Sequence, residues 1–273
     1  MPRIAFHSHT TRSLPVQDDL KLAKQTGYNG IICTHAKIQD YLKNNNQKNL
    51  RELVKDSGLA VFGISNIHMD LMKINEQKIT AVKRFSRLVR TMKGNFISIT
   101  PDGRRNREKE RDNEELYTHY AQNLAVLAEG AEEYGVYLSI EQEKPHPVFS
   151  SPVTLTYIIN KTGKDNLGFV FDPFSYMVAD IALEEVETME GFFHIVYLSD
   201  LPDKRNLREK DRLIPGEGIL DFERIFKIVH RCDYKGVYAL KLHSAYRTKK
   251  RNRQLLREAR EPMEAYLEIL NYL

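Results

Sequence analysis

Short apolar runs alternate with longer amphipathic segments along the whole chain. The apolar runs predict strands, because they are too short for buried helices and are flanked by polar residues or glycine. The predicted strands are residues 3–9, 29–34, 59–64, 95–100, 136–141, 167–171, 193–198 and 236–242.

The segments between these runs carry apolar residues at helical spacing. Ile79, Val82 and Phe85 show this spacing in the segment 76–92, where it favours one buried helical face over the alternation of a strand. The pair Ser151-Pro152 indicates a helix start, since proline suits the first helical position. The predicted helices are 16–25, 36–57, 76–92, 113–134, one that opens at Pro152, 221–232, and a last helix that runs up to Leu273.

Eight strand–helix units without a Gly-x-Gly-x-x-Gly fingerprint favour a (β/α)8 TIM barrel, an α/β fold, over a doubly wound sheet. The chain shows no repeat, linker or low-complexity tract. We therefore expect a single TIM-barrel domain that spans residues 1–273.

The composition indicates a cytoplasmic protein without a membrane span. Hydrophobic residues make up 41%, charged residues 29%, and the mean hydropathy is −0.49. No stretch approaches the roughly 20 apolar residues of a membrane span, and the N-terminus lacks an apolar signal core. Cys33 and Cys232 lie in or beside apolar runs, so we expect buried thiols in a reducing compartment.

A net charge of +4 and a pI of about 8.8 make the chain mildly basic. The excess lies in the runs 103–111, 204–212 and 247–253. Such runs are typical of solvated loops, and they could also attract a phosphorylated substrate. Nucleic acid is not the expected partner, because the chain lacks the overall charge and interleaved aromatic residues of that class.

Candidate chemistry gathers where the predicted strands end, which is where TIM barrels carry their active sites. The candidates are His7, His9, His35, His68, Glu141, Glu143, Asp172, Tyr197, Ser199, Lys241 and His243. Imidazoles and carboxylates at one barrel mouth suit a metal site or proton transfer. The structural alternatives are that His7 and His9 only cap a strand end and that Glu141 is a loop charge. His119, His146 and His230 lie in predicted helices or loops and are expected at the surface.

Three segments resemble the xylose isomerase-like barrels, a superfamily that includes sugar-phosphate isomerases and epimerases, dehydroshikimate dehydratase and endonuclease IV. They are Leu124–Glu141, Leu167–Asp172 and the Pro-Gly-Glu-Gly loop within Ile214–Phe222. The resemblance implies the same fold over nearly the whole chain. It also implies a divalent ion held by glutamate, aspartate, histidine and glutamate from strands five to eight.

Only part of that implied ligand set is present. Glu141 and Asp172 match, but Tyr197 stands at the histidine position and Lys241 at the last glutamate position. Ser175 also replaces a histidine that many members carry. A protonated lysine cannot bind a metal, and at about 4 Å it would repel a divalent cation by several kcal/mol in a partly desolvated pocket.

We therefore expect no cofactor, with Lys241 in the place of the metal and paired with Glu141, Asp172 or both. The alternative is a rebuilt site for Mn, Zn or Mg that uses His7, His9, His35 or His243 beside Glu141 and Asp172.

The N-terminal segment has a second resemblance. Phe6-His7-Ser8-His9 is similar to the His-x-His opening of the PHP metallophosphoesterases, whose histidines bind metals. Thr34 stands where that family has an acid before His35, and its later ligands have no clear match.

Together these features predict a sugar isomerase- or epimerase-like, or dehydratase-like, enzyme that acts on a small polyhydroxy carbonyl compound by proton transfer. Glu141 is the expected base, Lys241 the electrophile and Asp172 its partner. His7, His9, His35, Tyr197 and His243 are expected to contact the substrate, and Arg212 or Lys204 to hold an anionic group. The alternatives are a metal-dependent phosphoesterase or nuclease, and a non-catalytic sugar-binding barrel.

Overall fold

The computed structural model describes residues 3–102, 113–142, 146, 148–186, 192–243 and 251–269. Its strands are β1 (Arg3–His7), β2 (Gly30–Thr34), β3 (Ala60–Met69), β4 (Phe96–Pro101), β5 (Tyr137–Ile140), β6 (Leu167–Phe171), β7 (Phe193–Leu198) and β8 (Val237–Leu240). Its helices are α1 (Val16–Thr26), α2 (His35–Asn44), α3 (Gln47–Ser57), α4 (Glu76–Thr91), α5 (Glu114–Glu132), α6 (Pro152–Thr162), α7 (Pro173–Val178), α8 (Leu183–Val186), α9 (Phe222–Arg231) and α10 (Asn252–Ile269).

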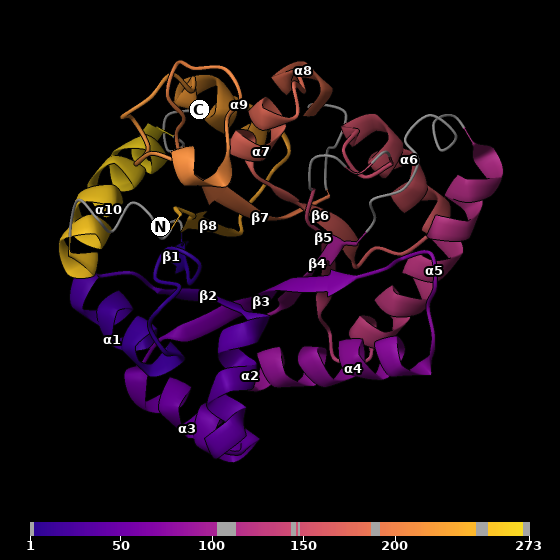
Figure 1. Ribbon diagram of the computed structural model, residues 1–273, viewed down its shortest axis with the longest axis horizontal. Helices are drawn as coiled ribbons and strands as arrows, with labels where there is room; N and C mark the ends of the chain where they lie inside the picture. Colours follow the sequence, from indigo (N-terminus) through magenta and orange to yellow (C-terminus); the bar gives the residue numbers. More distant parts are fainter. Residues whose placement is uncertain are drawn as a thin grey trace.

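The strands close into a barrel in chain order, with β8 paired to β1 and every pair parallel. Figure 1 shows the strands as an inner ring and the helices around its outside. The predicted (β/α)8 fold is confirmed. In such a ring all strands point the same way, so their C-terminal ends form one mouth.

Two apolar clusters hold this arrangement together. A smaller cluster inside the ring includes Ile32, Phe62, Phe96 and Ile195. A larger cluster packs the outward-facing strand residues against the helices. The period-two alternation of the strands sends successive side chains to these two clusters.

Two details differ from the elements predicted from sequence. The helix expected over 36–57 is two helices, because Asn46 caps α3 by accepting a hydrogen bond from the backbone N–H of Asn49. Strand β3 continues to Met69 past a register shift at Asn66, whose φ of 56° is tolerated by asparagine. His68 therefore lies inside β3, where the prediction placed it after the strand.

Among the described helices, none is long and apolar enough to cross a membrane. Cys33 is buried, Cys232 is partly buried, and both are free thiols.

Candidate functional site

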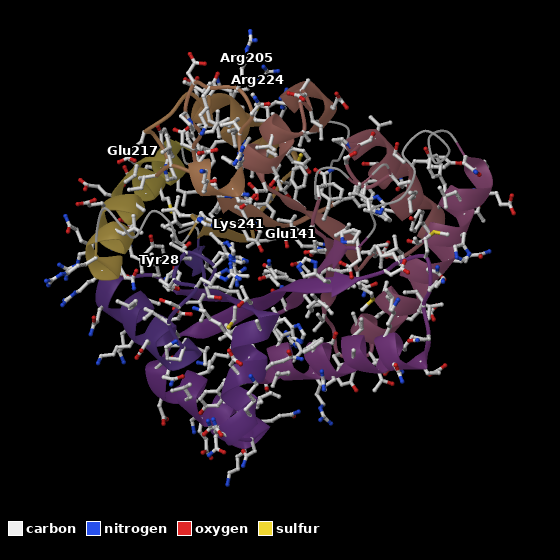
Figure 2. All side chains as sticks on the ribbon, viewed as in Figure 1. Tyr28, Glu141, Arg205, Glu217, Arg224 and Lys241 are labelled. Carbon is white, nitrogen blue, oxygen red and sulfur yellow. The ribbon has the colours of Figure 1, made fainter. Side chains whose placement is uncertain are left out.

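The centre of the barrel mouth holds a buried lysine between two carboxylates. Lys241 Nζ lies 2.5 Å from Glu141 Oε1 and 3.3 Å from Asp172 Oδ2. These three residues directly follow β8, β5 and β6, and all are buried. Figure 2 shows Lys241 and Glu141 close together within the ring of strands. The structure thus brings together the three residues for which we predicted the central chemistry.

Neighbouring side chains hold this centre in place. The other oxygen of Glu141, Oε2, lies 3.3 Å from Ser98 Oγ and 3.5 Å from Thr100 Oγ1, both on β4. The Lys241 ammonium lies 4.7 Å from the centroid of the Tyr197 ring, a favourable contact for a cation in a desolvated place. The ammonium therefore has a carboxylate on two sides and an aromatic face on another.

Arg212 is the second cation of the site and is fully buried. Its guanidinium donates two parallel hydrogen bonds to Asp172, of 2.9 and 2.7 Å, and two to Glu209, of 2.8 and 2.9 Å. Further bonds reach Ser199 and Ser175. All donors of the guanidinium are used by the protein. Arg212 therefore has no donor left over for an anionic substrate group in this arrangement, and Lys204 is paired with Asp211.

The loop that carries Arg212 is fixed by the buried carboxylate of Asp200. This group accepts hydrogen bonds from the backbone N–H groups of Gly216, Gly218 and Leu220. Asp200 also pairs with Leu213 in a short antiparallel bridge. The Pro-Gly-Glu-Gly loop thus wraps around Asp200. Arg212 lies just before this loop, and its Cζ lies 4.2 Å from the centroid of the Phe174 ring.

The charges of the site support one another. Burial alone would lower the pKa of Lys241, but Glu141 and Asp172 outweigh it and raise that pKa. Burial alone would raise the pKa of Asp172, but Arg212 and Lys241 hold it well below its usual range. Lys241 is therefore an ammonium at neutral pH, which suits a hydrogen-bond donor and does not suit a Schiff-base nucleophile.

His7 is a buried support for the loop after β1. Its Nδ1 accepts a hydrogen bond from the backbone N–H of His9 at 3.1 Å, and its Nε2 lies 2.7 Å from Ser65 Oγ. These bonds assign the proton to Nε2. Burial, with Lys241 next, holds the pKa of His7 well below its usual value. Both ring nitrogens are in use within the protein, so in this arrangement His7 has no nitrogen left for a substrate or a metal.

Tyr197 forms the floor of the site. Its ring is fully buried and meets His7 edge-on at 5.1 Å between centroids. Burial, with Glu141 and Asp172, raises the pKa of its hydroxyl well above the usual value, so the phenol stays protonated. The ring lies against the Lys241 ammonium and stabilises its charge. Because Tyr197 is fully buried, it has no exposed surface with which to make the predicted substrate contact.

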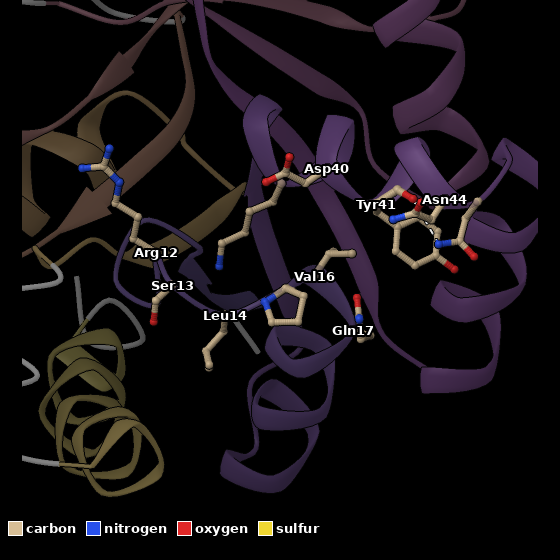
Figure 3. A pocket seen from close by; sticks show the side chains of 11 residues that line it. Arg12, Ser13, Leu14, Val16, Gln17, Asp40, Tyr41 and Asn44 are labelled. Atoms are coloured by element: carbon tan, nitrogen blue, oxygen red, sulfur yellow. Dashed lines mark hydrogen bonds between the residues drawn. The ribbon is translucent and has the colours of Figure 1, made fainter.

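His9 and His243 lie at the mouth itself. Both are partly buried, and their ring centroids are 5.6 Å apart. The same loop carries Arg12, which borders a pocket together with Asp40 and Tyr41 of α2 (Figure 3). Of the predicted substrate contacts, His9 and His243 are the two that the structure places at the mouth with exposed surface.

The other predicted histidines lie elsewhere. The ring of His35 packs edge-on against Phe85 of α4, 4.6 Å away, and its contact with a substrate stays a prediction. His68 is exposed and pairs with Asp102. His146 was expected at the surface but is buried. Its Nδ1 accepts hydrogen bonds from the backbone N–H groups of Val148 and Phe149. Glu143 lies outside the described residues.

The sequence reasoning missed the supporting groups of the site, Glu209, Ser98 and Thr100. Glu209 stands three residues before Arg212 inside a run of basic residues, a pattern that normally indicates a solvated loop. The one available signal was alternation, which places Ser98 and Thr100 on the inward face of β4.

The donor set does not fit the divalent ion that the family resemblance implies. Among the described residues, no three His, Cys, Asp or Glu side chains are grouped so that they could share a metal. Both oxygens of Asp172 accept from Arg212, and Glu141 Oε1 accepts from Lys241. Two buried cations at the carboxylates would repel a third.

Comparison with known proteins agrees with this architecture. An inosose isomerase from Bacillus velezensis is 25% identical over 96% of each chain. The crystal structure of IolI protein with a bound zinc atom superposes with a TM-score of 0.80 at 20% identity and covers 98% of this chain and 97% of its own. The structure of L-ribulose 3-epimerase gives a TM-score of 0.76 at 19% identity, over 100% and 96% of the two chains.

The family model described as xylose isomerase-like TIM barrel matches residues 20–266. That match covers most of the chain and includes Glu141, Asp172, Arg212 and Lys241. The chain belongs to the xylose isomerase-like TIM barrel family.

Proposed function

We propose that this protein is a sugar isomerase- or epimerase-like enzyme that moves a proton beside the carbonyl group of a small polyhydroxy ketone or aldehyde. The observation that carries the proposal is the Lys241 ammonium held between Glu141 and Asp172 at the barrel mouth. A fixed cation beside a carboxylate is what an enediolate-forming reaction needs.

The third N–H of Lys241 is the part of this arrangement that a substrate can use. An ammonium has three donors, and two of them point at Glu141 and Asp172. The remaining donor has no hydrogen-bond acceptor among the described residues. A substrate carbonyl oxygen placed there would gain a charge-assisted hydrogen bond that strengthens as negative charge develops on it.

Glu141 supplies the base in this mechanism. Its carboxylate removes the proton from the carbon next to the carbonyl, and the electrons of that C–H bond move onto the carbonyl oxygen at Lys241. Asp172, held by Arg212, keeps the ammonium oriented. Return of a proton to the same carbon completes an epimerisation. Return to the former carbonyl carbon, with transfer of the neighbouring hydroxyl proton to the oxygen at Lys241, completes an isomerisation.

The relatives support a sugar-like substrate, because those reported above are named for an inosose and for L-ribulose. We propose a carbohydrate-like small molecule as the partner. The phosphoesterase alternative is not favoured, since both nitrogens of His7 are occupied within the protein. Two free thiols, one of them buried, fit a reducing cytoplasmic setting.

Proton exchange is the direct test of the proposal. The protein is incubated in D2O with an inosose or with L-ribulose, and deuterium uptake beside the carbonyl is followed by NMR. We expect uptake with the wild type and at least a hundredfold loss with Glu141→Gln, in line with the usual contribution of a general base. Glu114→Gln, at an exposed ion pair with Lys161, is the matched control. Binding without uptake by the wild type would favour a sugar-binding barrel.

We also propose that the centre works without a divalent ion, with Lys241 as its built-in cation. The wild type purified without chelator should hold no stoichiometric zinc, manganese or magnesium by elemental analysis. Activity should survive dialysis against EDTA. One equivalent of metal that is lost together with activity would contradict this proposal and leave the proton-transfer proposal standing.

A further inference from the structure

The two sides of the barrel mouth carry different ionisable groups. In a closed ring ordered β1 to β8, β1 and β5 stand opposite each other. Glu141 directly follows β5, and His9 lies two residues after β1. Lys241 follows β8, the neighbour of β1, and reaches across to Glu141. A substrate oxygen at Lys241 would therefore have a carboxylate on one side and an imidazole toward the other.

His9 is placed to meet a ligand, unlike His7. Its backbone N–H is held by His7 Nδ1, while its ring nitrogens make no hydrogen bond with any described residue. The ring is partly buried and lies 5.6 Å from that of His243 and 6.3 Å from that of His7. The loop is fixed at this point, since Thr10 Oγ1 accepts the backbone N–H of Leu242 next to Lys241.

The proposed reaction needs a second proton-transfer group besides Glu141. After Glu141 has taken a proton from one side of the carbon, inversion requires a proton from the other side. Lys241 is bound to two carboxylates and serves the oxygen, and His7 has both nitrogens occupied. We propose that His9 is this second group and protonates the enediolate carbon on the side away from Glu141, which makes the enzyme an epimerase.

The charge state of His9 fits a relay. Burial lowers its pKa to about 4, and Lys241, His243 and Arg12 act in the same direction against Glu209. The ring is therefore neutral at pH 7. One ring nitrogen gives its proton to the enediolate carbon while the other takes a proton from water, so the ring ends neutral. The carbonyl forms again as the C–H bond is made, and the proton held by Glu141 passes to the hydroxide left by that water, so atoms and charge balance.

This inference rests on the proposed function, and one experiment tests both. The wild type and His9→Gln are compared in D2O with L-ribulose, and NMR follows deuterium uptake into the substrate and formation of its epimer. With His9→Gln we expect the epimer to form about a hundred- to ten-thousandfold more slowly, while uptake through Glu141 stays within about tenfold of the wild type. His230→Gln, an exposed histidine on α9, is the matched control and should behave as the wild type.

The outcomes are distinguishable. Parallel loss of uptake and epimer in His9→Gln, a higher KM with unchanged kcat, or full epimer formation would each overturn the role of His9. The same holds if the wild type takes up deuterium without inverting the carbon. No uptake by the wild type with either L-ribulose or an inosose would defeat the proposed function itself. His9→Asn serves as the second variant, and a thermal unfolding curve identifies any variant that fails to fold.

Discussion

Two buried lysine–carboxylate pairs lie near the barrel mouth and share the same geometry. Lys241 and Glu141 are 2.5 Å apart with side chains 9% and 8% exposed. Lys37 of α2 and Asp19 of α1 are also 2.5 Å apart, with 7% and 0% exposed. Distance and burial alone do not distinguish the two pairs.

Their remaining donors do distinguish them. Lys37 Nζ also donates to the carbonyl oxygen and the hydroxyl of Thr11, so the protein provides acceptors for every one of its hydrogens. Lys241 keeps one donor that no described residue accepts. The Lys37–Asp19 pair joins the loop after β1 to α1 and α2, whereas Lys241 keeps a donor that a ligand could use.

The surrounding charges also differ. Asp19 meets one cation, and burial raises its pKa to about 6 against the effect of Lys37. Asp172 meets two cations, and its pKa is held well below the usual range despite complete burial. The second buried cation thus lowers the pKa of Asp172 below its usual range, whereas Lys37 alone does not offset the effect of burial on the pKa of Asp19.

The largest effect should separate the two lysines. We expect Lys241→Met to lower turnover by about a hundred- to ten-thousandfold, because the developing oxyanion loses its donor. Lys37→Met should instead cost about 3–5 kcal/mol of unfolding free energy by leaving Asp19 unpaired, with kcat per folded molecule close to the wild type. Enzyme assays and urea unfolding of both variants check this. Equal losses of turnover in the two variants would show that the unused donor of Lys241 does not distinguish it from Lys37.

Arg212 should be required for stability. Arg212→Met leaves Asp172 buried without its main partner, and we expect a loss of about 3–5 kcal/mol in urea unfolding. Arg212→Lys should recover only part of this loss, since an ammonium cannot make the two parallel bonds to Asp172. A loss of less than about 1 kcal/mol in Arg212→Met would contradict the conclusion that Arg212 stabilises the buried carboxylate of Asp172.

The two carboxylates should respond to pH with opposite signs. Asp19 has a raised folded pKa, so its native state binds more protons and stability falls as pH rises through the window from about 4 to about 6. Asp172 has a lowered folded pKa, so its contribution is complete above about pH 4 and is lost only as pH falls further.

Asp19→Asn should therefore remove a decline of up to about 3 kcal/mol between pH 4 and 7. The measurement is the unfolding free energy of variant and wild type across that range. Parallel pH curves for the two proteins would show that Asp19 has an ordinary pKa.

An exposed pair should contribute least. Lys83 and Glu133 are also 2.5 Å apart, but their side chains are 38% and 51% exposed. We expect Lys83→Gln to leave the midpoint of urea unfolding unchanged within the error of the measurement, because solvent screens the pair. A larger loss would show that distance matters more than burial in these pairs.

Local patterns were enough for the fold. The predicted strand and helix segments occur in the same order as the observed elements. The eight-stranded ring followed from the number and order of those segments. Helix boundaries were less certain, because the break between α2 and α3 depends on one capping asparagine, Asn46, inside a continuous amphipathic pattern.

The site was predictable only in part. Glu141, Asp172 and Lys241 each end a strand, so the barrel topology alone brings them to one mouth. Arg212 lies in a loop with no periodic pattern, and its inward turn depends on hydrogen bonds from the loop backbone to Asp200. The packing of His35 against Phe85 and the hydrogen bonds of His146 with the turn that follows it also depend on the folded chain and were not predicted.

The sequence by itself determined the barrel and the lysine among carboxylates, because both follow from strand order and from which residue ends each strand. Tertiary structure alone decided which groups remain available. Arg212 and His7 complete their hydrogen bonds through distant residues, Asp172 and Ser65, in addition to near neighbours. Lys241 keeps one donor, and His9 its ring nitrogens, without a hydrogen-bond partner among the described residues. Hydrogen-bond satisfaction depends on contacts between distant segments, and a linear pattern does not contain them.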